Sequence, residues 1–319
     1  MKSNFEGMEE NKQSVRASVS KFLETELLYE MLPNSGQVLV LEKGLCLLDV
    51  IELSLSHRQE AAIVWDPSTM DFIGIVTDRD MLNIIISQYN QDDMELEESQ
   101  IVARLKNKTL ESWRQENSQN GLHFVTPDDN LFIATKKLKE NRLHRIPIID
   151  QKENMVLGIL SIEAVLRFFV DNYVSNSSLF DVSMQEFSIG TSGSIITAPS
   201  NYSLIQALGV MAKHKLSSLP LLDDFGRVAG VVFLSDIPQI IRSGLYLNPQ
   251  SEVLSVVEQV NENGDYGLSR FGILTSEDTL KSMIQKLAAS PERKIYRLVD
   301  GKLDMIITES DLFGYLMVE

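Results

Sequence analysis

The sequence predicts an α/β fold (α+β repeats) made of four copies of one unit. Each copy has an apolar run that ends in Asp, a few turn residues, a second apolar run, and a polar pair that opens a helix. The first runs end at Asp66, Asp150, Asp223 and Asp300. The second anchors, where the helices open, are Asp80, Ala164, Asp236 and Asp311. Repeats of this length indicate one supersecondary unit that has been duplicated and stacked.

Each unit is expected to follow the order strand, helix, strand, strand, helix. In the first copy these elements are predicted at 37–41, 45–55, 61–65, 72–76 and 78–87. The helices carry apolar residues at helical spacing, and the strands are short apolar runs bounded by turn residues. Strands that alternate with helices at this spacing predict an α/β or α+β unit. In the second copy, helices are expected at 131–138 and 162–170, after helix-starting residues at 126–129.

The repeats and the segments between them give seven predicted regions. A polar N-terminal segment with a disordered tip and a lead-in helix covers 1–34, and the repeats are placed at 35–90, 122–174, 191–245 and 246–319. A charged segment at 91–121, which contains KNKTLESWRQE, is expected to be an exposed helical linker. A second linker at 175–190 is expected to separate two halves of two repeats each.

Composition limits the possible functions. The 319 residues carry a net charge of −16, whereas nucleic acid or an anionic membrane surface as the main partner requires a basic face. The single cysteine, Cys46, is expected to pack in a core, and no apolar run is long enough for a membrane span. No nucleophile, metal-binding or phosphate-transfer motif stands out, so we expect neither an enzyme nor a metal or redox cofactor. Cytoplasm or nucleus is the expected location.

The repeated units resemble CBS domains, which share this order of elements. Four such units in tandem resemble the γ-subunit family of AMP-activated protein kinase. The resemblance is carried by the sequence motifs LESWRQE (110–116), NRLHRIPIID (141–150), IGTS (189–192) and HKLSSLPLLDDFGRV (214–228). The resemblance implies two Bateman-type modules in a flattened disc. It also implies AMP, ADP or ATP in clefts between repeats, no catalysis, and a kinase (α) and a scaffolding (β) subunit as partners.

Three carboxylates fall where that family holds the ribose: Asp80, Asp236 and Asp311. An ionised carboxylate can accept hydrogen bonds from two neighbouring hydroxyls, and each such bond contributes about 1.5–3 kcal/mol. The alternative is a helix N-cap without any ligand, because Asp is favoured at helix starts. The two roles can coexist at one helix start.

Other residues match positions that contact the phosphates or the base in that family. They are Thr77, His144, Arg145, Thr191, Ser217, Arg293, Lys294, Thr308 and Ser310. Arg can grip a phosphate in a bidentate way, and hydroxyls can donate to it. Each also has a purely structural reading, as a solvated turn residue before a strand or as a local cap. The cleft formed by repeats 3 and 4 keeps most of these groups, so it is the preferred site.

The sequence also departs from the family. Glu60 stands where the family has Arg, with Arg58 two residues away, and Glu163 and Ala164 replace two basic residues. Like charges repel at these positions, and Ala164 cannot hold a ribose, so we expect weaker or fewer nucleotide sites. The alternative function is therefore an assembly subunit of the same kinase that has lost most sensing. A third reading is a CBS module that regulates another enzyme or a transporter.

Overall fold

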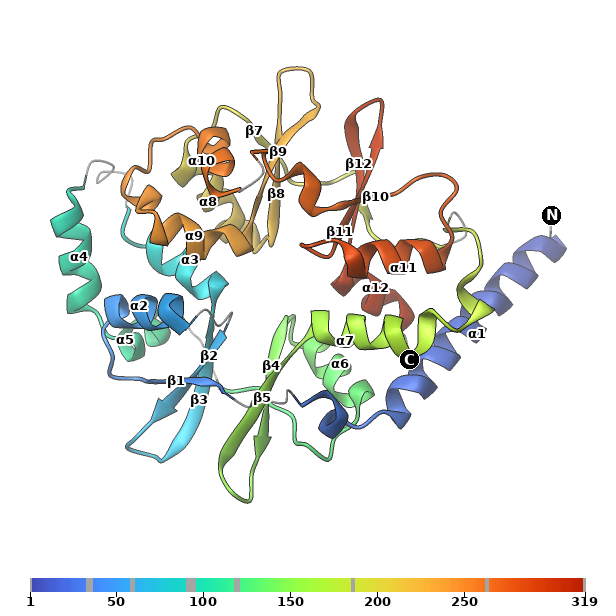
Figure 1. Ribbon diagram of the computed structural model, residues 1–319, viewed down its shortest axis with the longest axis horizontal. Helices are drawn as coiled ribbons and strands as arrows, with labels where there is room; N and C mark the ends of the chain where they lie inside the picture. The colour runs from blue at the N-terminus through green and yellow to red at the C-terminus, as the bar shows by residue number, and fades with distance from the viewer. Residues whose placement is uncertain are drawn as a thin grey trace. The chain divides into compact units, whose positions relative to one another are not determined.

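The computed structural model describes residues 2–32, 37–57, 61–89, 96–117, 121–184, 187–261 and 264–317, with side chains from residue 12 onward. The described chain contains the four predicted α/β units in sequence order, each with an antiparallel hairpin followed by a helix (Figure 1). The predicted fold class is confirmed.

Repeat 1 has all five expected elements. They are β1 (Leu39–Glu42), α2 (Leu47–His57), β2 (Ala61–Asp66), β3 (Asp71–Thr77) and α3 (Asp78–Ile86). Strand β1 pairs with β2 in parallel, and β2 pairs with β3 in antiparallel. The parallel pair requires the intervening helix, because two parallel strands need a crossover connection. Every element begins and ends within about two residues of its prediction.

Repeat 2 shortens the first strand to a single bridge. Val125 pairs in parallel with Ile148, in the place that β1 holds in repeat 1. The other elements are α6 (Leu131–Glu140), β4 (Arg145–Asp150), β5 (Met155–Ser161) and α7 (Ile162–Phe169), which continues as the π-helical turn η2 (Val170–Val174).

Repeat 3 begins with the two-residue strand β7. Its elements are β7 (Ala198–Pro199), α8 (Leu204–His214), β8 (Ser218–Leu222), β9 (Val228–Phe233), the 3-10 turn η5 (Leu234–Asp236) and α9 (Ile237–Arg242). Pro238 lies in the first turn of α9, where its missing N–H leaves no helical hydrogen bond unmade.

Repeat 4 contains β10 (Gly272–Ile273), α11 (Leu280–Ala289), β11 (Lys294–Val299), β12 (Lys302–Thr308) and α12 (Glu309–Leu316). A segment from before repeat 3, β6 (Thr191–Ser192), pairs with β12 and extends this sheet to the order β10-β11-β12-β6. Residues 191–192, which we assigned to repeat 3, therefore contribute to the sheet of repeat 4.

The four hairpins share one irregularity. The register shifts once in each, between Val64 and Trp65, Ile148 and Ile149, Leu221 and Leu222, and Arg297 and Leu298. A bulge bends its strand and increases the local twist. Its recurrence at one position shows that the four units are copies in three dimensions as well as in sequence.

The chain forms two compact units, and each combines repeats that are not neighbours in sequence. Unit 1 contains 1–36, 123–195 and 269–319, which carry repeats 2 and 4. Unit 2 contains 37–122 and 196–268, which carry repeats 1 and 3. It also includes residues 246–268, which we assigned to repeat 4. Each unit has its own apolar core. The repeats that share a core are thus 1 with 3 and 2 with 4, whereas the order along the sequence suggested 1 with 2 and 3 with 4.

The N-terminal helix and the second linker complete the core of unit 1. Helix α1 (Lys2–Thr25) starts at the segment where we expected a disordered tip. Its buried side chains are Val15, Val19 and Leu23, and the turn η1 (Leu28–Met31) follows. The linker, with η3 (Ser178–Phe180), buries Phe180, Met184, Phe187 and Ile189. It is thus part of a core and not merely a spacer.

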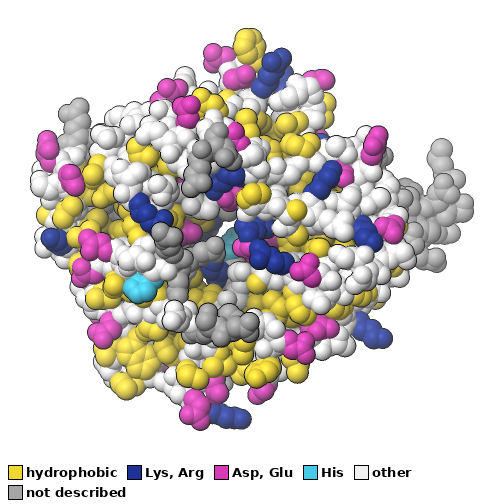
Figure 2. Space-filling model, viewed as in Figure 1, with side chains coloured by type: hydrophobic (Ala, Val, Ile, Leu, Met, Phe, Trp, Pro, Cys, Tyr) yellow, Lys and Arg dark blue, Asp and Glu magenta, His cyan; other side chains and the backbone are white. Residues whose placement is uncertain are grey.

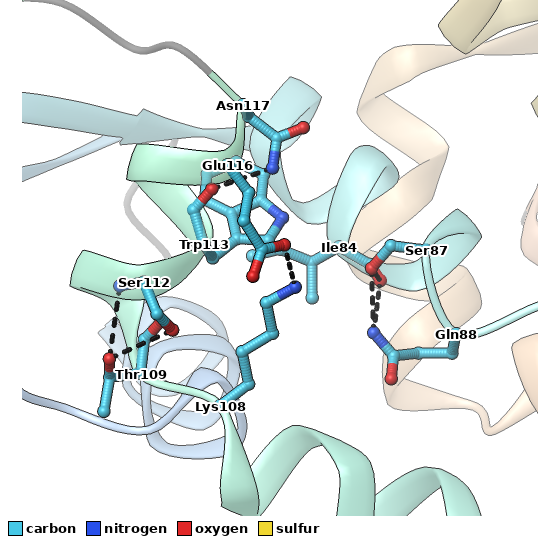
Figure 3. Close-up of polar contacts among 9 residues, drawn as sticks. All are labelled: Ile84, Ser87, Gln88, Lys108, Thr109, Ser112, Trp113, Glu116 and Asn117. Carbon is cyan, nitrogen blue, oxygen red and sulfur yellow. Dashed lines mark hydrogen bonds and ion pairs between the residues drawn. The ribbon is translucent and has the colours of Figure 1, made fainter.

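Unit 2 also contains α4 (Glu98–Asn107), α5 (Leu110–Glu116), η6 (Leu245–Leu247) and α10 (Val253–Val260), and η7 (Leu268–Arg270) stands at the boundary between the units. The prediction of an exposed linker helix is wrong for α5. Leu110 is fully buried and Trp113 is 1% exposed. Figure 3 shows how the helix is bounded: the Thr109 hydroxyl accepts from the Ser112 N–H, and Asn117 donates to the Trp113 carbonyl at 2.8 Å.

Arg114 explains why so polar a helix is buried. Its guanidinium donates to the Ile73 carbonyl at 3.0 Å and to the Ile75 carbonyl at 3.5 Å, on the outer side of the edge strand β3. The group lies against Gly74, where an added Cβ would come within 2.1 Å of it. Burial lowers the pKa of Arg114, and the negative charge of Asp80 acts in the opposite direction.

Candidate functional site

The three predicted ribose-binding carboxylates all lie at helix starts. Asp80 is in the first turn of α3, Asp236 immediately precedes α9, and Asp311 is in the first turn of α12. Each accepts a hydrogen bond from the backbone N–H three residues earlier, through Oδ2. These donors are Thr77, Phe233 and Thr308, at 2.8, 2.7 and 2.9 Å. All three carboxylates thus act as the third-residue partner of a capping box, and not as the hydrogen-bonding N-cap residue that the alternative reading expected.

A carboxylate can accept more hydrogen bonds than the one from the backbone N–H. An ionised carboxylate has about four lone-pair sites on two oxygens. The hydroxyls of Thr77 and Thr308 donate to the same Oδ2 as their backbone N–H groups, at 3.0 and 2.8 Å. These two hydroxyls, which we predicted near phosphate or base, thus take part in the capping boxes. A cap contact and a ligand contact are chemically compatible at one carboxylate.

Repeat 2 has a cap of a different kind. The Ser161 hydroxyl accepts from the Ala164 N–H at 3.1 Å, so α7 is capped without a carboxylate at the third helical position. Ala164 offers no acceptor to a ribose. Repeat 2 is the one repeat that lacks this carboxylate.

In unit 2, Arg79 lies beside the capping carboxylate of repeat 1. Burial lowers the pKa of Arg79, while the adjacent charge of Asp80 raises it. One terminal nitrogen, Nη1, is buried and has no hydrogen-bond partner among the described residues. A buried donor without an acceptor is destabilising, and such groups usually meet a water or an ion. The Ser217 carbonyl in the same unit accepts from the Leu234 N–H at 2.9 Å.

In unit 1, His144 from repeat 2 lies beside Glu309 from repeat 4. The His144 Nδ1 and a Glu309 carboxylate oxygen are 3.6 Å apart. Glu309 is 9% exposed, and its Oε2 has no hydrogen-bond partner in the described part of the chain. Burial would raise the pKa of Glu309, but the polar contact with His144 and the charge of Lys294 outweigh it, so the pKa is lowered.

A second contact joins the same two repeats in the opposite direction. The Arg293 guanidinium of repeat 4 forms an ion pair with Glu163, the second residue of α7. Arg167, one turn further along α7, contacts the same carboxylate oxygen at 3.0 Å. Arg293 has a positive φ of 49°, a conformation that few residues other than glycine adopt. Its basic neighbour Lys294 is 4% exposed, and its Nζ donates to the Glu292 carbonyl.

The other predicted site residues lie in strands β4 and β6 and in helix α12. Arg145 opens β4 and pairs with Ser161 across the hairpin. Thr191 is exposed in β6, and Ser310 is exposed in the first turn of α12. Glu60 and Arg58 lie outside the described residues. Asp236 and Ser217 belong to unit 2, whereas Asp311, Thr191, Thr308 and Ser310 belong to unit 1.

Sequence reasoning missed Glu309 and Arg79. A signal was present, because Glu309 is the first and Arg79 the second residue of a helix that the repeat pattern locates. What the sequence alone did not give was the pairing of repeat 2 with repeat 4, which brings Glu309 to His144.

The exposed surface carries both signs of charge. On the face shown in Figure 2, acidic and basic side chains are scattered among apolar and neutral ones. No group of three or more His, Cys, Asp or Glu side chains in the described ranges is placed to hold a metal ion. Among the described helices, none combines the length and the apolar character that crossing a bilayer requires.

The comparisons with known proteins agree with the repeats. The CBS domain family matches residues 119–171 and 188–243. The γ subunit of 5'-AMP-activated protein kinase from Saccharomyces cerevisiae is 25% identical over 307 residues, covering 94% of this chain and 93% of the yeast protein. The Dictyostelium discoideum γ subunit is 24% identical over 313 residues, covering 93% of this chain but only 52% of that protein.

Solved structures support the fold. A Methanocaldococcus jannaschii protein, described as an archaeal homologue of γ-AMPK, superposes with a TM-score of 0.67 at 14% identity, covering 91% of this chain and 99% of that one. A Pyrococcus horikoshii protein superposes with a TM-score of 0.51 at 15% identity and 91% coverage of this chain, with 100% of its own chain covered. At such identities the likeness concerns the fold alone.

Proposed function

Because the chain is a divergent member of the γ-subunit family of AMP-activated protein kinase, we propose that it is a non-catalytic regulatory subunit of a heterotrimeric kinase of that type. Its ligands would be AMP, ADP or ATP, and its partners a kinase subunit and a scaffolding subunit, in the cytoplasm or nucleus. The main support is the recurrence of a capping carboxylate at three of the four helix starts.

The carboxylates suit this role through their position. Asp80 and Asp236 are 7% and 3% exposed, so a hydroxyl that reaches either of them forms its hydrogen bond in a partly desolvated setting. Charge-assisted hydrogen bonds contribute about 1.5–3 kcal/mol, more than neutral ones. Two ribose hydroxyls on one carboxylate would provide a substantial part of the affinity of a nucleotide.

Regulation would follow from differential affinity. A ligand shifts a conformational equilibrium only by the difference between its affinities for the two states. Nucleotide bound beside these helix starts would favour one arrangement of the repeats, and the kinase subunit would respond to that arrangement.

A second candidate function, an assembly subunit with little sensing, is favoured by one observation. Ala164 replaces the carboxylate of repeat 2, so at most three of the four equivalent positions keep the proposed ribose contact. The assembly role and the sensing role share the same partners and differ in their response to nucleotide.

Co-expression with a kinase and a scaffolding subunit tests both. The proposal expects a stable complex of one copy of each chain, whose kinase activity changes when AMP is added. A complex with unchanged activity at millimolar AMP would support assembly alone. Failure to recover any complex would overturn both roles and favour a CBS module for a different enzyme or transporter.

A further inference from the structure

Three exposed apolar side chains gather at one place in unit 1. Leu27 is 48% exposed, Tyr29 is 71% exposed and Ile133 is 37% exposed. An isolated antiparallel bridge pairs Leu27 with Asn130, which sets the turn η1 beside the start of α6 (Figure 1). Single exposed apolar side chains are ordinary on a protein surface, whereas grouped ones point to a contact surface. We call these three side chains the η1–α6 patch.

The backbone under the patch is held at several points. The Leu28 N–H donates to the Asp129 carbonyl at 3.0 Å, and the Asn130 side chain accepts from the Ile133 N–H at 2.9 Å. Leu28 is fully buried in the core of unit 1, so the exposed side chains on either side of it stand on an anchored segment. A surface that is already ordered loses less conformational entropy when a partner binds.

The two segments that carry the patch are acidic. Residues 22–32 and 124–135 contain no Lys or Arg, and their five carboxylates are Glu24, Glu26, Glu30, Asp128 and Asp129. Within the described ranges, none of these five forms an ion pair with a basic side chain. Burial raises the pKa of the Glu26 carboxyl, and the nearby negative charge of Glu30 raises it further. A cation that docked here would relieve this repulsion.

The lysines that flank these segments do not neutralise them. Residues 21–32 and 124–140, which include all of α6, hold six acids and four lysines, a net charge of −2. Lys137 and Lys139 donate to the backbone carbonyls of Phe124 and Met317, at 3.1 and 3.0 Å. The surface around the patch is therefore negative, even with the whole helix counted.

These two properties together define the chemistry of the occupant. The phosphates of an anionic membrane or of a nucleic acid would be repelled by the carboxylates. An apolar segment without charge would fill the patch but leave the surrounding acids unmatched, whereas Lys or Arg at its ends would complement them and speed association. Tyr and Arg are also among the residues that carry most of the binding energy at protein interfaces.

We propose that the η1–α6 patch is a docking surface for a segment of a partner protein chain in which apolar side chains are flanked by Lys or Arg. The inference rests on the proposed function for the source of that segment, which is the kinase or the scaffolding subunit. It does not depend on nucleotide binding, because no residue of the patch is among the predicted nucleotide contacts.

Photo-crosslinking of the co-expressed complex tests the docking surface. A photoreactive phenylalanine is placed at position 29, the purified complex is irradiated, and the linked peptide is mapped by mass spectrometry. We expect position 29 to link to a segment of one partner subunit that is rich in Lys or Arg. Phe225 is the matched control, because this aromatic residue is 75% exposed in the turn between β8 and β9, with Arg227 lying 6.0 Å from its ring centre. The same group at position 225 should link at most a tenth as much.

Substitutions measure what the patch contributes to binding. The linked segment is synthesised as a fluorescent peptide and titrated with the full chain. The double variant Tyr29→Ser with Ile133→Ser should raise the Kd at least tenfold, and Glu30→Lys should raise the Kd and reduce its dependence on salt. Phe225→Ser should leave the Kd unchanged. The substituted side chains are exposed, and circular dichroism confirms that each variant is folded.

The outcomes separate this inference from the proposed function. If the complex forms but position 29 links no more than position 225, the docking surface is refuted and the proposed function stands. If no complex is recovered, the proposed function fails, and the chain alone is titrated with a short amphipathic peptide of Leu and Lys. Binding that the double variant weakens at least tenfold, and Phe225→Ser does not, then supports the surface. No binding of this peptide, or equal affinities of the three chains for it, overturns the inference.

Discussion

Asp236 provides a test that separates the helix cap from the ligand contact. The Asp236 carboxylate accepts the Phe233 N–H at 2.7 Å, and Phe233 is fully buried. Replacing Asp236→Ala leaves that N–H without its acceptor in a place that water does not reach. Replacing Asp236→Asn keeps a carbonyl oxygen of the same reach and removes only the charge.

The magnitudes follow from these contacts. An unpaired buried donor costs about 1–3 kcal/mol, and the loss of a negative charge at a helix start adds about 0.3–1 kcal/mol. Asp236→Ala should therefore destabilise the chain by about 2–3 kcal/mol. For chains somewhat shorter than this one, each kcal/mol lowers the Tm by about 2–4 °C. Asp236→Asn should lose about 1 kcal/mol or less, because the cap survives.

Thermal unfolding and AMP calorimetry on the same samples give the readout. We expect Asp236→Asn to unfold close to the wild type and yet bind AMP about tenfold more weakly, because a charge-assisted hydrogen bond is roughly twice as strong as a neutral one. If Asp236→Asn binds AMP as well as the wild type does, the carboxylate is only a cap. If Asp236→Ala is as stable as the wild type, the account of the cap is wrong.

Two further substitutions test the packing around the repeats. Burial would raise the pKa of Asp278, but hydrogen bonds from Lys286, Ser282 and Thr275 lower the pKa to about 2. The ionised Asp278 carboxylate therefore stabilises the fold above about pH 4, and this stabilisation is lost as the pH falls through 2. In urea unfolding, Asp278→Asn should be less stable than the wild type by about 2 kcal/mol at pH 7, and this difference in unfolding free energy should narrow below pH 4. A difference that does not depend on pH would contradict this. Gly74→Ala should lose about 2–4 kcal/mol in the same assay, because its Cβ would displace the buried Arg114 guanidinium, whereas Gly44→Ala meets nothing within 4 Å and should be nearly neutral. Equal losses at both glycines would refute that contact.

The repeated elements could be predicted because their signals are local. The helix expected at 78–87 is observed at Asp78–Ile86, and the strand expected at 72–76 at Asp71–Thr77. Apolar runs, turn residues and helix caps act within a few residues of the chain, so they can be recognised from the sequence.

The failures come from contacts between distant segments. Helix α5 looked exposed because its sequence, LESWRQE, is polar, yet Arg114 is 7% exposed. An arginine can be buried where its guanidinium meets backbone carbonyls, and only the folded chain shows that edge strand β3 supplies them.

The site was predictable only in part for the same reason. The residues at each helix start were located by the repeat, and the capping role of Asp80, Asp236 and Asp311 was one of the alternatives considered. The ion pair between Glu163 and Arg293 joins positions 130 residues apart. Tertiary structure decides which repeats pack against each other, and local sequence patterns do not predict that pairing.

A crystal of the chain soaked with AMP tests the central claim most directly. The account predicts electron density for a ribose with its hydroxyls within hydrogen-bond distance of the Asp80, the Asp236 or the Asp311 carboxylate. A crystal that takes up AMP elsewhere, or shows no nucleotide beside any of these carboxylates at millimolar AMP, would contradict it.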